Sequence, residues 1–405
     1  MRLDYKVKPT YDAAMTPAPP LDPAQVAETM RPLEQATMLP PAAFTDPAVL
    51  DWELENLFAG GWICLGHVSQ VDEPGKFLMR VLGRDSVVVI GGPDGRPRAF
   101  HNVCRHRGSR LVTEESGKVN RRLRCPYHAW SYDLDGALVA APHMQGVEGF
   151  DSSCSGLAPV RLSTIGGLLM VDLGGEAPDP HEHLGDLVEH LERYRTLGLL
   201  SGGKVEYEVR ANWKGIVENY NECLHCPGVH PELNALSNYM SGEEMEGDGA
   251  WCGGTMTLTG EGAATMGSDG GHQHRPPIDG LDETDLSSIL YVALFPNALV
   301  SFHPDYVMLH TLYPRAPDLT EVSCEFFFEP RTVEDPGFDP GDAISFWDTT
   351  NRQDWRVCEL AQMGAGSRGY KAGRYSLEET DTHAFDRMVA ERYLEALPDR
   401  EGVSA

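Results

Sequence analysis

The sequence predicts an α+β protein, with an all-β region followed by a domain in which helices cover an antiparallel sheet. Short strand-like runs separated by turn signals, such as Gly92-Pro93-Asp94-Gly95, fill the stretch from residue 62 to residue 171. Beyond about residue 178 the strand-like runs are longer and stand between long helical segments, which is typical of a sheet with helices packed on it. A chain of 405 residues is long enough for two or three domains.

The composition changes at two places along the chain and so divides it into three segments. Residues 1–45 are rich in proline and alanine and predict an arm that packs on the helix-and-sheet domain. Residues 46–178 form the all-β domain, which opens with a helix from Asp46 to Ala59; Asp46 is its expected N-cap and Pro47 its first residue. Residues 179–405 form the helix-and-sheet domain.

The expected elements follow from hydrophobic period and turn residues. Strands are expected in the first domain at 62–65, 76–81, 86–89, 98–103 and 168–171, and in the second at 203–209, 256–259, 290–295, 299–302, 307–313 and 322–328. Helices are expected at 180–197, 213–224, 341–363 and 382–397.

The charge and hydropathy of the chain exclude several classes of partner. A formal net charge of −28 repels phosphate groups, so we expect no nucleic acid and no membrane surface as partner. No run of about 18 apolar residues is present, and the first ten residues lack the apolar core of a secretion signal, so a cytoplasmic protein is expected. The charge fits simple solubility and also the docking of a basic electron-transfer partner.

Two cysteines and two histidines form the most specific motif. Cys104 and His106 follow the pattern C-x-H, and 18 residues later Cys125 and His128 follow the pattern C-x2-H. Thiolates and imidazoles in two paired loops can hold two irons, with both cysteines on one iron and both histidines on the other. A structural zinc site uses the same ligand types, but zinc fingers usually place two cysteines in one half of the motif and two histidines in the other. Each half here contributes one of each, which favours an iron–sulfur cluster.

A second metal site is predicted around His225 and His230. Glu222 precedes His225 by three residues and would share its face on a helix expected at 213–224. Pro227 should break this helix, so that His230 can turn back toward His225. Two lone histidines are more often structural, but the helix break and the upstream motif favour a shared metal.

Together the two motifs resemble those of the Rieske-type non-heme iron oxygenases, and this resemblance implies that a carboxylate from far downstream completes the second site. The helix expected at 341–363 has four candidates: Asp342, Asp348, Asp354 and Glu359. Asp348 and Glu359 each have an arginine one helical turn away, and Asp342 lies at the helix start, where a carboxylate has a capping role. Asp354 has no cation at i±3 or i±4. An unpaired carboxylate is costly to bury unless a metal partners it, so Asp354 is the predicted ligand.

These motifs resemble the Rieske-type non-heme iron oxygenases, in particular the oxygenase (alpha) subunit of the ring-hydroxylating family. Cytochrome-complex Rieske proteins carry an extra disulfide cysteine in each loop, where this chain has Arg107-Gly108-Ser109 and Tyr127. The resemblance implies a Rieske [2Fe-2S] domain and a catalytic domain of the helix-grip type. It also implies a [2Fe-2S] cluster on Cys104, His106, Cys125 and His128, and a mononuclear Fe(II) on His225, His230 and Asp354.

The resemblance further implies an enzyme that oxidises a small organic substrate with O2, as a monooxygenase or a dioxygenase. Electrons would come from NAD(P)H through a separate reductase of the flavin or ferredoxin type, because the one G-x-G-x-x-G match, Gly364–Gly369, follows a helix rather than a strand. A homotrimer is implied, in which a carboxylate bridges the cluster of one subunit and the iron of the next. Glu222 is at the position of that bridging, catalytically required carboxylate.

The bridging residue is usually Asp, and Glu222 in its place is similar to the carnitine, glycine betaine and stachydrine oxygenases. This similarity implies N-demethylation or hydroxylation of a quaternary ammonium or N-methyl compound. Five aromatic residues could line a cage for such a cation: Trp251, Tyr291, Phe302, Tyr306 and Tyr313. Aromatic ring hydroxylation or O-demethylation of an aromatic acid is the alternative, and a Rieske electron carrier without oxygenase activity is the alternative class.

Nine cysteines at irregular spacing do not suggest a disulfide framework. Cys223 and Cys226 form an isolated C-x2-C. We expect both to be reduced thiols that pack around the metal-binding helix.

Overall fold

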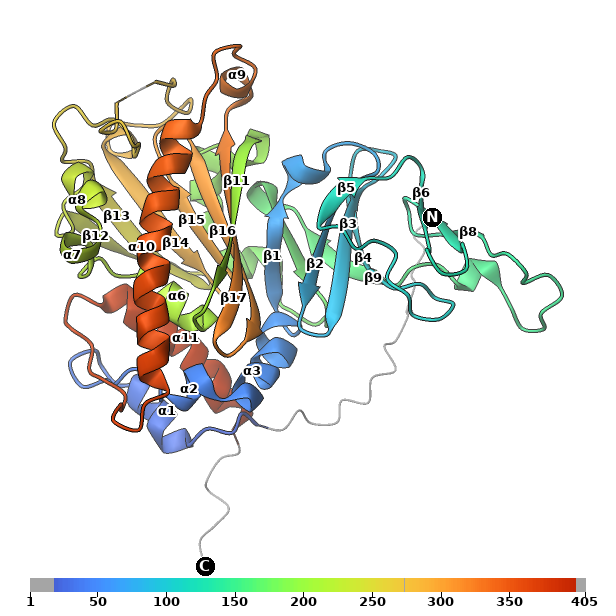
Figure 1. Cartoon of the computed structure of the whole chain (residues 1–405), viewed down its shortest axis with the longest axis horizontal. Coiled ribbons are helices and arrows are strands. Elements are labelled where there is room, and N and C mark those ends of the chain that lie inside the picture. Colours follow the sequence, from blue (N-terminus) through green and yellow to red (C-terminus); the bar gives the residue numbers. More distant parts are fainter. Residues whose placement is uncertain (1–17, 273, 398–405) are drawn as a thin grey trace, which may run out of the picture.

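A computed structural model describes residues 18–272 and 274–397, and its strands form two seven-stranded sheets and one three-stranded sheet. Every strand pair in these sheets is antiparallel. Figure 1 shows the first sheet beside the second, with the small sheet at the far end of the molecule. The predicted α+β fold class, an all-β domain followed by an antiparallel sheet with helices, is confirmed.

The first sheet has the strand order β1-β10-β9-β4-β3-β2-β5. Its strands are β1 (Trp62–His67), β2 (Lys76–Leu82), β3 (Asp85–Gly91), β4 (Pro97–His101), β5 (Ser116–Lys118), β9 (Pro159–Ser163) and β10 (Leu168–Asp172). The three-stranded sheet consists of β6 (Arg122–Arg124), β7 (Ser131–Asp133) and β8 (Leu138–Ala140). It projects from the first sheet and carries one of the two cysteine–histidine loops.

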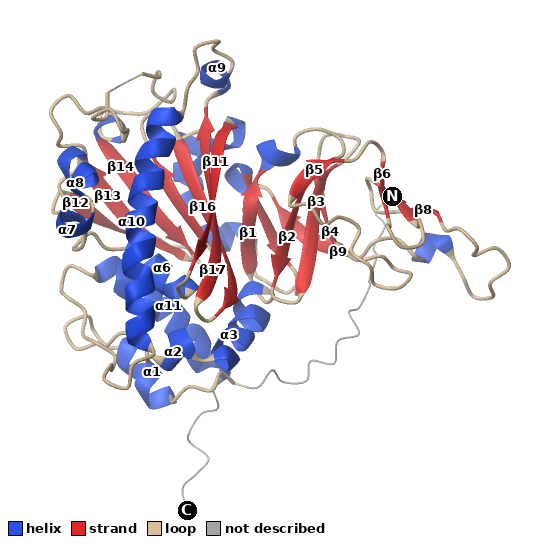
Figure 2. Ribbon diagram, viewed as in Figure 1, coloured by secondary structure: helices blue, strands red, loops and turns tan. Residues whose placement is uncertain are grey.

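The second sheet has the order β11-β17-β16-β15-β14-β13-β12. Its strands are β11 (Leu200–Val209), β12 (Gly242–Glu246), β13 (Trp251–Thr257), β14 (Ser288–Leu294), β15 (Ala298–Phe302), β16 (Val307–Ala316) and β17 (Leu319–Phe328). Figure 2 shows helices α6 (Trp213–Tyr220), α10 (Gly341–Ala365) and α11 (Thr380–Ala396) gathered along this sheet.

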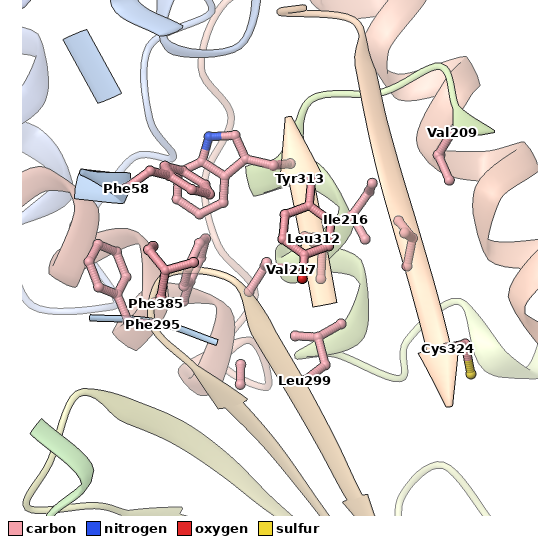
Figure 3. Close-up of a cluster of buried hydrophobic side chains, with 14 of the residues drawn as sticks. Phe58, Val209, Ile216, Val217, Phe295, Leu299, Leu312, Tyr313, Cys324 and Phe385 are labelled. Atoms are coloured by element: carbon pink, nitrogen blue, oxygen red, sulfur yellow. The ribbon is translucent and has the colours of Figure 1, made fainter. Parts of the chain in front are cut away.

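Both faces of the second sheet are buried at strands β14 to β17, which explains why these strands contain near-continuous apolar runs. Leu299 and Leu312 belong to the core shared with α6, α10 and α11, whereas their neighbours Val300 and Leu309 pack with α4 (Pro180–Leu184), α5 (Leu187–Arg193), β1 and β10. Figure 3 shows Ile216 and Val217 of α6 among sheet residues of the core that contains Leu299 and Leu312.

Most expected elements are present, but several boundaries were wrong. Asp46 caps α3 (Pro47–Glu53) as predicted, and a π-helical turn continues this helix to Phe58. The single helix expected at 180–197 is broken at Gly185, whose φ of 53° is left-handed. The helix expected at 213–224 ends at Tyr220, and β12 was not predicted.

The described part of the N-terminal segment lies on the helices of the second sheet. Helix α1 (Pro23–Thr29) packs on α11, and His383 Nε2 lies 2.9 Å from the carbonyl oxygen of Thr29. Helix α2 (Ala42–Thr45) leads directly into α3. Residues 1–17 lie outside the described residues, so the expected arm is seen only from residue 18 onward. No described helix is both long and apolar enough to cross a membrane.

A fully buried ion pair joins three helices. Glu53 Oε1, at the end of α3, lies 2.5 Å from Lys214 Nζ of α6, and neither side chain is exposed. Trp213 Nε1 donates to Glu53 Oε2 at 2.8 Å, and the Tyr393 hydroxyl of α11 also donates to this carboxylate. The hydrogen bonds satisfy the buried charge and fix α6 between α3 and α11.

We expect the Lys214→Met variant to lose about 3–5 kcal/mol of unfolding free energy, because it leaves Glu53 buried without a cation. Chemical denaturation followed by circular dichroism measures this loss. The matched variant Lys204→Met removes an exposed lysine that pairs with Glu206 and should cost no more than about 1 kcal/mol. Equal stability of the two variants would contradict the role of the buried pair.

Candidate metal centres

The first candidate centre lies where helix α6 ends and two short helices follow. Asn221 caps the C-terminus of α6, and His225 immediately precedes α7 (Cys226–Val229). His230 separates α7 from α8 (Pro231–Leu236), so prolines near the start of both short helices prevent a continuous helix. The chain therefore turns between the two histidines, as the sequence predicted.

Three potential ligand atoms converge in this segment. His230 Nε2 lies 2.7 Å from Asp354 Oδ1 of α10, His225 Nε2 lies 3.2 Å from the same oxygen, and the two Nε2 atoms are 3.1 Å apart. Among the described residues, this is the one group of three or more His, Cys, Asp and Glu side chains whose geometry could hold a metal ion. Two imidazoles and one carboxylate are the donor set of a facial triad, which leaves positions open for O2.

Neighbouring side chains hold both imidazoles in place. His225 Nδ1 donates to Glu222 Oε1 at 2.6 Å, and His230 Nδ1 donates to Gln353 Oε1 at 2.7 Å. Such contacts fix the tautomer and turn the other ring nitrogen toward a metal. Asn219 Nδ2 also lies 3.4 Å from His225 Nε2. Gln353 and Asn219 were not identified from the sequence, where no spacing pattern marks them.

The electrostatics of the triad suit a cation. Burial opposes protonation of His225, but hydrogen bonds with Asp354 and Glu222 raise its pKa to about 9. Burial would raise the pKa of Asp354, yet hydrogen bonds from His225 and His230 lower it. A metal-free triad therefore holds a proton among its ligands, and a bound metal would displace it.

Glu222 contacts His225 for a different reason from the one predicted. The two residues were expected to share a face of one helix, but α6 ends at Tyr220 and Glu222 lies in the following loop. Its second carboxylate oxygen accepts a hydrogen bond from the backbone N–H of Leu224 at 2.6 Å. A side chain that bonds its own backbone in this way competes with helix continuation.

The expectation of reduced thiols at Cys223 and Cys226 was wrong. The structure joins them in a disulfide, on either side of Leu224 and His225. The remaining cysteines of the chain, seven in number, are free. A C-x2-C spacing with its ends 5.1 Å apart between Cα atoms is within the range that a disulfide can bridge.

The other three carboxylates considered on α10 have partners elsewhere. Asp348 pairs with Arg352 at 3.0 Å, as predicted. Glu359 forms no ion pair with Arg356 within the described residues, contrary to expectation, and accepts a weak bond from the backbone of Arg210. Asp342 pairs with Arg275 at 2.5 Å rather than only capping the helix. None of the three contributes to the group around His225.

A cavity of about 200 Å³ opens beside the triad. Its aromatic walls come from Tyr220, Tyr239, Tyr291 and Trp347. Of the five aromatic residues expected to form a cage, only Tyr291 lines this cavity. The other four, Trp251, Phe302, Tyr306 and Tyr313, are buried in the protein core. Strand periodicity could not separate them, because both faces of the sheet are covered.

The second candidate centre lies at the opposite end of the molecule (Figure 1). Cys104 and His106 follow β4, and Cys125 and His128 lie in the turn between β6 and β7. The two histidine rings are 4.8 Å apart, and the ring of Trp130 stacks on His106. Folding therefore brings the two cysteine–histidine loops together, although 18 residues separate them in the sequence.

The donor atoms of this second centre fit an iron–sulfur cluster. The Nδ1 atoms of His106 and His128 are buried and have no hydrogen-bond partner in the described structure, and both thiols are buried and free. Burial raises the pKa of the Cys125 thiol, but the backbone N–H groups of His128 and Tyr127 and the Cys104 side chain lower it overall. Two orphaned imidazole nitrogens beside two polarised thiols match the ligands that a [2Fe-2S] cluster would take.

Arginines are concentrated near this centre despite the net charge of −28. Six exposed arginines, none of which forms an ion pair within the described residues, belong to its loops and to the adjoining strand β6: Arg105, Arg107, Arg110, Arg121, Arg122 and Arg124. We call these six residues the arginine cap.

Both centres lie in regions that match known domains. Residues 61–151 match the Rieske [2Fe-2S] domain, and residues 197–395 match the ring hydroxylating alpha subunit (catalytic domain). A glycine betaine monooxygenase oxygenase subunit of Chromohalobacter salexigens is 32% identical over 377 residues, which cover 86% of this chain and 84% of that protein. The chloroplastic choline monooxygenase of Arabidopsis thaliana is 30% identical over 370 residues, covering 88% and 83%.

Solved structures agree with this assignment. The quaternary ammonium Rieske monooxygenase CntA in complex with L-carnitine superposes with a TM-score of 0.76 at 25% identity and covers 92% of this chain and 99% of CntA. Naphthalene 1,2-dioxygenase from Rhodococcus sp. shares the fold, with a TM-score of 0.76 at 20% identity and coverage of 93% and 99%. The chain therefore belongs to the Rieske-type oxygenases and is an oxygenase subunit with a [2Fe-2S] domain and a mononuclear iron domain.

Proposed function

We propose that this chain oxidises a small quaternary ammonium or related N-methyl compound with O2 at an iron held by His225, His230 and Asp354. The observation that supports this most directly is the cavity beside the triad, which combines aromatic walls with acidic side chains. Such a lining attracts cations. The glycine betaine and choline monooxygenases among the relatives are named for substrates of this class.

Three aromatic rings of the cavity contact one another and form a continuous wall. The ring centroids of Tyr220 and Tyr291 are 5.9 Å apart, and those of Tyr291 and Trp347 are 6.3 Å apart, in edge-to-face arrangements. The face of each ring can attract an ammonium group, with a contribution of about 1–2 kcal/mol per ring when the cation is desolvated.

The proposed reaction balances with two electrons and two protons. One atom of O2 enters a substrate C–H bond, and the other leaves as water. If the carbon is an N-methyl group, the N-hydroxymethyl product breaks its C–N bond and releases formaldehyde, a proton and a tertiary amine. A bound iron with open positions supplies the activation of O2.

The protein residues hold the metals and position their ligands. Cys104, Cys125, His106 and His128 would hold the cluster. Glu222 and Gln353 keep the Nε2 atoms of His225 and His230 turned toward the iron position. We take residues 46–178 and 179–405 as the limits of the cluster and iron domains.

Electrons are proposed to pass between copies of the chain. The loops of the cluster lie at one end of the molecule and helices α7 and α8 at the other (Figure 1). A homotrimer that places the cluster of one copy beside Glu222 of the next would close this separation. Inter-subunit electron transfer is described for the quaternary ammonium Rieske monooxygenase CntA.

A separate reductase is the proposed electron donor. The arginine cap surrounds the cluster ligands, so the donor that docks there would present acidic side chains. The overall charge had left open a basic partner, but the charge near the cluster has the opposite sign.

Wild-type protein should contain about three irons per chain, two in the cluster and one in the triad. The Asp354→Ala variant should contain about two, keep the visible spectrum of the cluster and release no formaldehyde from N-methylated ammonium compounds. Metal analysis and product assays measure both effects. Asp348→Ala is the matched control on the same helix, because Asp348 pairs with Arg352, and it should keep all three irons. Turnover confined to uncharged aromatic compounds would refute the proposed substrate class.

The Glu222→Gln variant should keep both metal centres and normal cluster reduction. Product formed per reduced cluster should fall at least about tenfold, because the carboxylate that orients His225 is lost. Single-turnover experiments on pre-reduced protein measure this ratio. Glu232→Gln removes an exposed carboxylate on α8 and serves as control. Unchanged yield in Glu222→Gln would leave Glu222 with a purely structural role.

Charge reversal in the arginine cap should slow reduction of the cluster by the physiological reductase. For the double variant Arg107→Glu and Arg121→Glu we expect a loss of about tenfold in rate at low ionic strength, shrinking as salt is added. Stopped-flow spectroscopy follows the cluster, and chemical reduction checks that it remains intact. Arg392→Glu, on the distant helix α11, should have no such effect. A faster reaction in the double variant would indicate a basic donor.

A further inference from the structure

The cavity beside the triad contains acidic side chains but, apart from the two histidines of the triad, no basic ones among its described residues. Of its described lining residues, six are Asp or Glu, and none is Lys or Arg: Glu222, Glu243, Glu244, Asp354, Glu378 and Asp381. Glu222 and Asp354 are engaged with the imidazoles. The other four, which we call the acidic rim, come from β12 and from the start of α11 with the residues just before it.

The acidic rim has no cation to balance it within the described part of the chain. None of its four carboxylates forms an ion pair there. The unbalanced negative charge affects Asp381: burial and the nearby charge of Glu244 raise the pKa of this carboxyl to about 7. A cation entering the cavity would relieve this repulsion, whereas an anionic group would add to it.

The guanidinium of Arg275, close behind the aromatic wall, is already neutralised. Trp347 Nε1 donates to the hydroxyl of Tyr306 at 2.7 Å, and Arg275 lies over the Tyr306 ring. Arg275 pairs with Asp305 at 3.0 Å and with Asp342 at 2.5 Å. It does not line the cavity. A substrate carboxylate would therefore find no cationic partner on this wall.

One polar atom of the wall is still without a partner. The Tyr291 hydroxyl is buried and makes no hydrogen bond within the described structure. No other described residue that lines the cavity has a buried side-chain polar atom in this condition. A buried hydroxyl without a partner is costly, so a polar group of a ligand that reaches it would satisfy it.

We propose that the site selects a quaternary ammonium cation that carries no carboxylate, such as an ammonium alcohol, over a zwitterionic betaine. This inference rests on the proposed function and narrows its substrate class. The ammonium group lies against Tyr220, Tyr291 and Trp347, within the field of the acidic rim. The Tyr291 hydroxyl bonds the uncharged polar group.

Binding measurements on the anaerobic holoenzyme separate the effects of the ammonium charge and of the carboxylate on affinity, because no turnover occurs. Calorimetric titrations would compare choline, its uncharged isostere 3,3-dimethyl-1-butanol, and glycine betaine, which has a carboxylate in place of the hydroxymethyl group. We expect choline to bind at least about tenfold more tightly than either of the others. Equal or tighter binding of glycine betaine would overturn the inference, and equal binding of the isostere would show that charge is not recognised.

The Glu244→Lys variant tests the acidic rim directly. Its preference for choline over glycine betaine should fall at least about tenfold at low ionic strength, because one carboxylate becomes a cation. Asp318→Lys makes the same change in an exposed residue outside the cavity and should leave the preference as it is. An unchanged preference in Glu244→Lys would show that the acidic rim does not contribute to the selection.

The Tyr291→Phe variant tests the hydroxyl. It should weaken the binding of choline several-fold while tetramethylammonium, which has no hydroxyl, binds within about twofold of wild type. Parallel loss for both ligands would assign Tyr291 to packing alone.

Product assays distinguish failure of the proposed function from failure of the selection inferred here. No oxidation of any quaternary ammonium compound would refute the proposed function itself. Oxidation of betaines in preference to ammonium alcohols would keep that function and refute only the selection argued here.

Discussion

The buried ion pair of Glu53 and Lys214 anchors helix α6, and the position of α6 determines where the first metal centre can form. Trp213 and Tyr393 share the same carboxylate, so α3, α6 and α11 are tied at one point inside the protein. The chain leaves α6 at Tyr220 and reaches His225 within five residues. Helix α10 brings Asp354 to the same place from a segment 124 residues beyond His230. The triad therefore depends on two helices packed against one sheet.

Charge is distributed unevenly over this acidic protein. The acidic rim lines the cavity near the triad, while the arginine cap lies beside the cysteine and histidine ligands at the other end. The net charge of −28 conceals this separation, since it is a sum over the whole chain. Each proposed site thus has a local field suited to its own partner, cationic in one case and acidic in the other.

Much of the fold could be predicted because the relevant signals are local. Asp46 and Pro47 mark the start of a helix, and apolar runs between turn residues mark the strands. Asp354 could be chosen over Asp348 because an arginine one turn away is visible in the sequence. The end of α6 and the Cys223–Cys226 disulfide could not, since loop hydrogen bonds and Cα separation decide them. Trp347 lines the cavity and Tyr306 does not, because tertiary packing decides which ring faces it. The hydrophobic period of a strand or helix carries no information on this.

The two imidazoles of the triad are held by acceptors of different charge, and this makes them unequal donors. His225 gives its Nδ1 proton to a carboxylate, whereas His230 gives its own to the neutral amide of Gln353. A carboxylate acceptor draws the imidazole toward imidazolate and increases the basicity of its other nitrogen more than an amide does. An ion held between them would meet a stronger base on the side of Glu222, the side that is proposed to receive the electron. The asymmetry is built into the protein before any metal, substrate or O2 arrives.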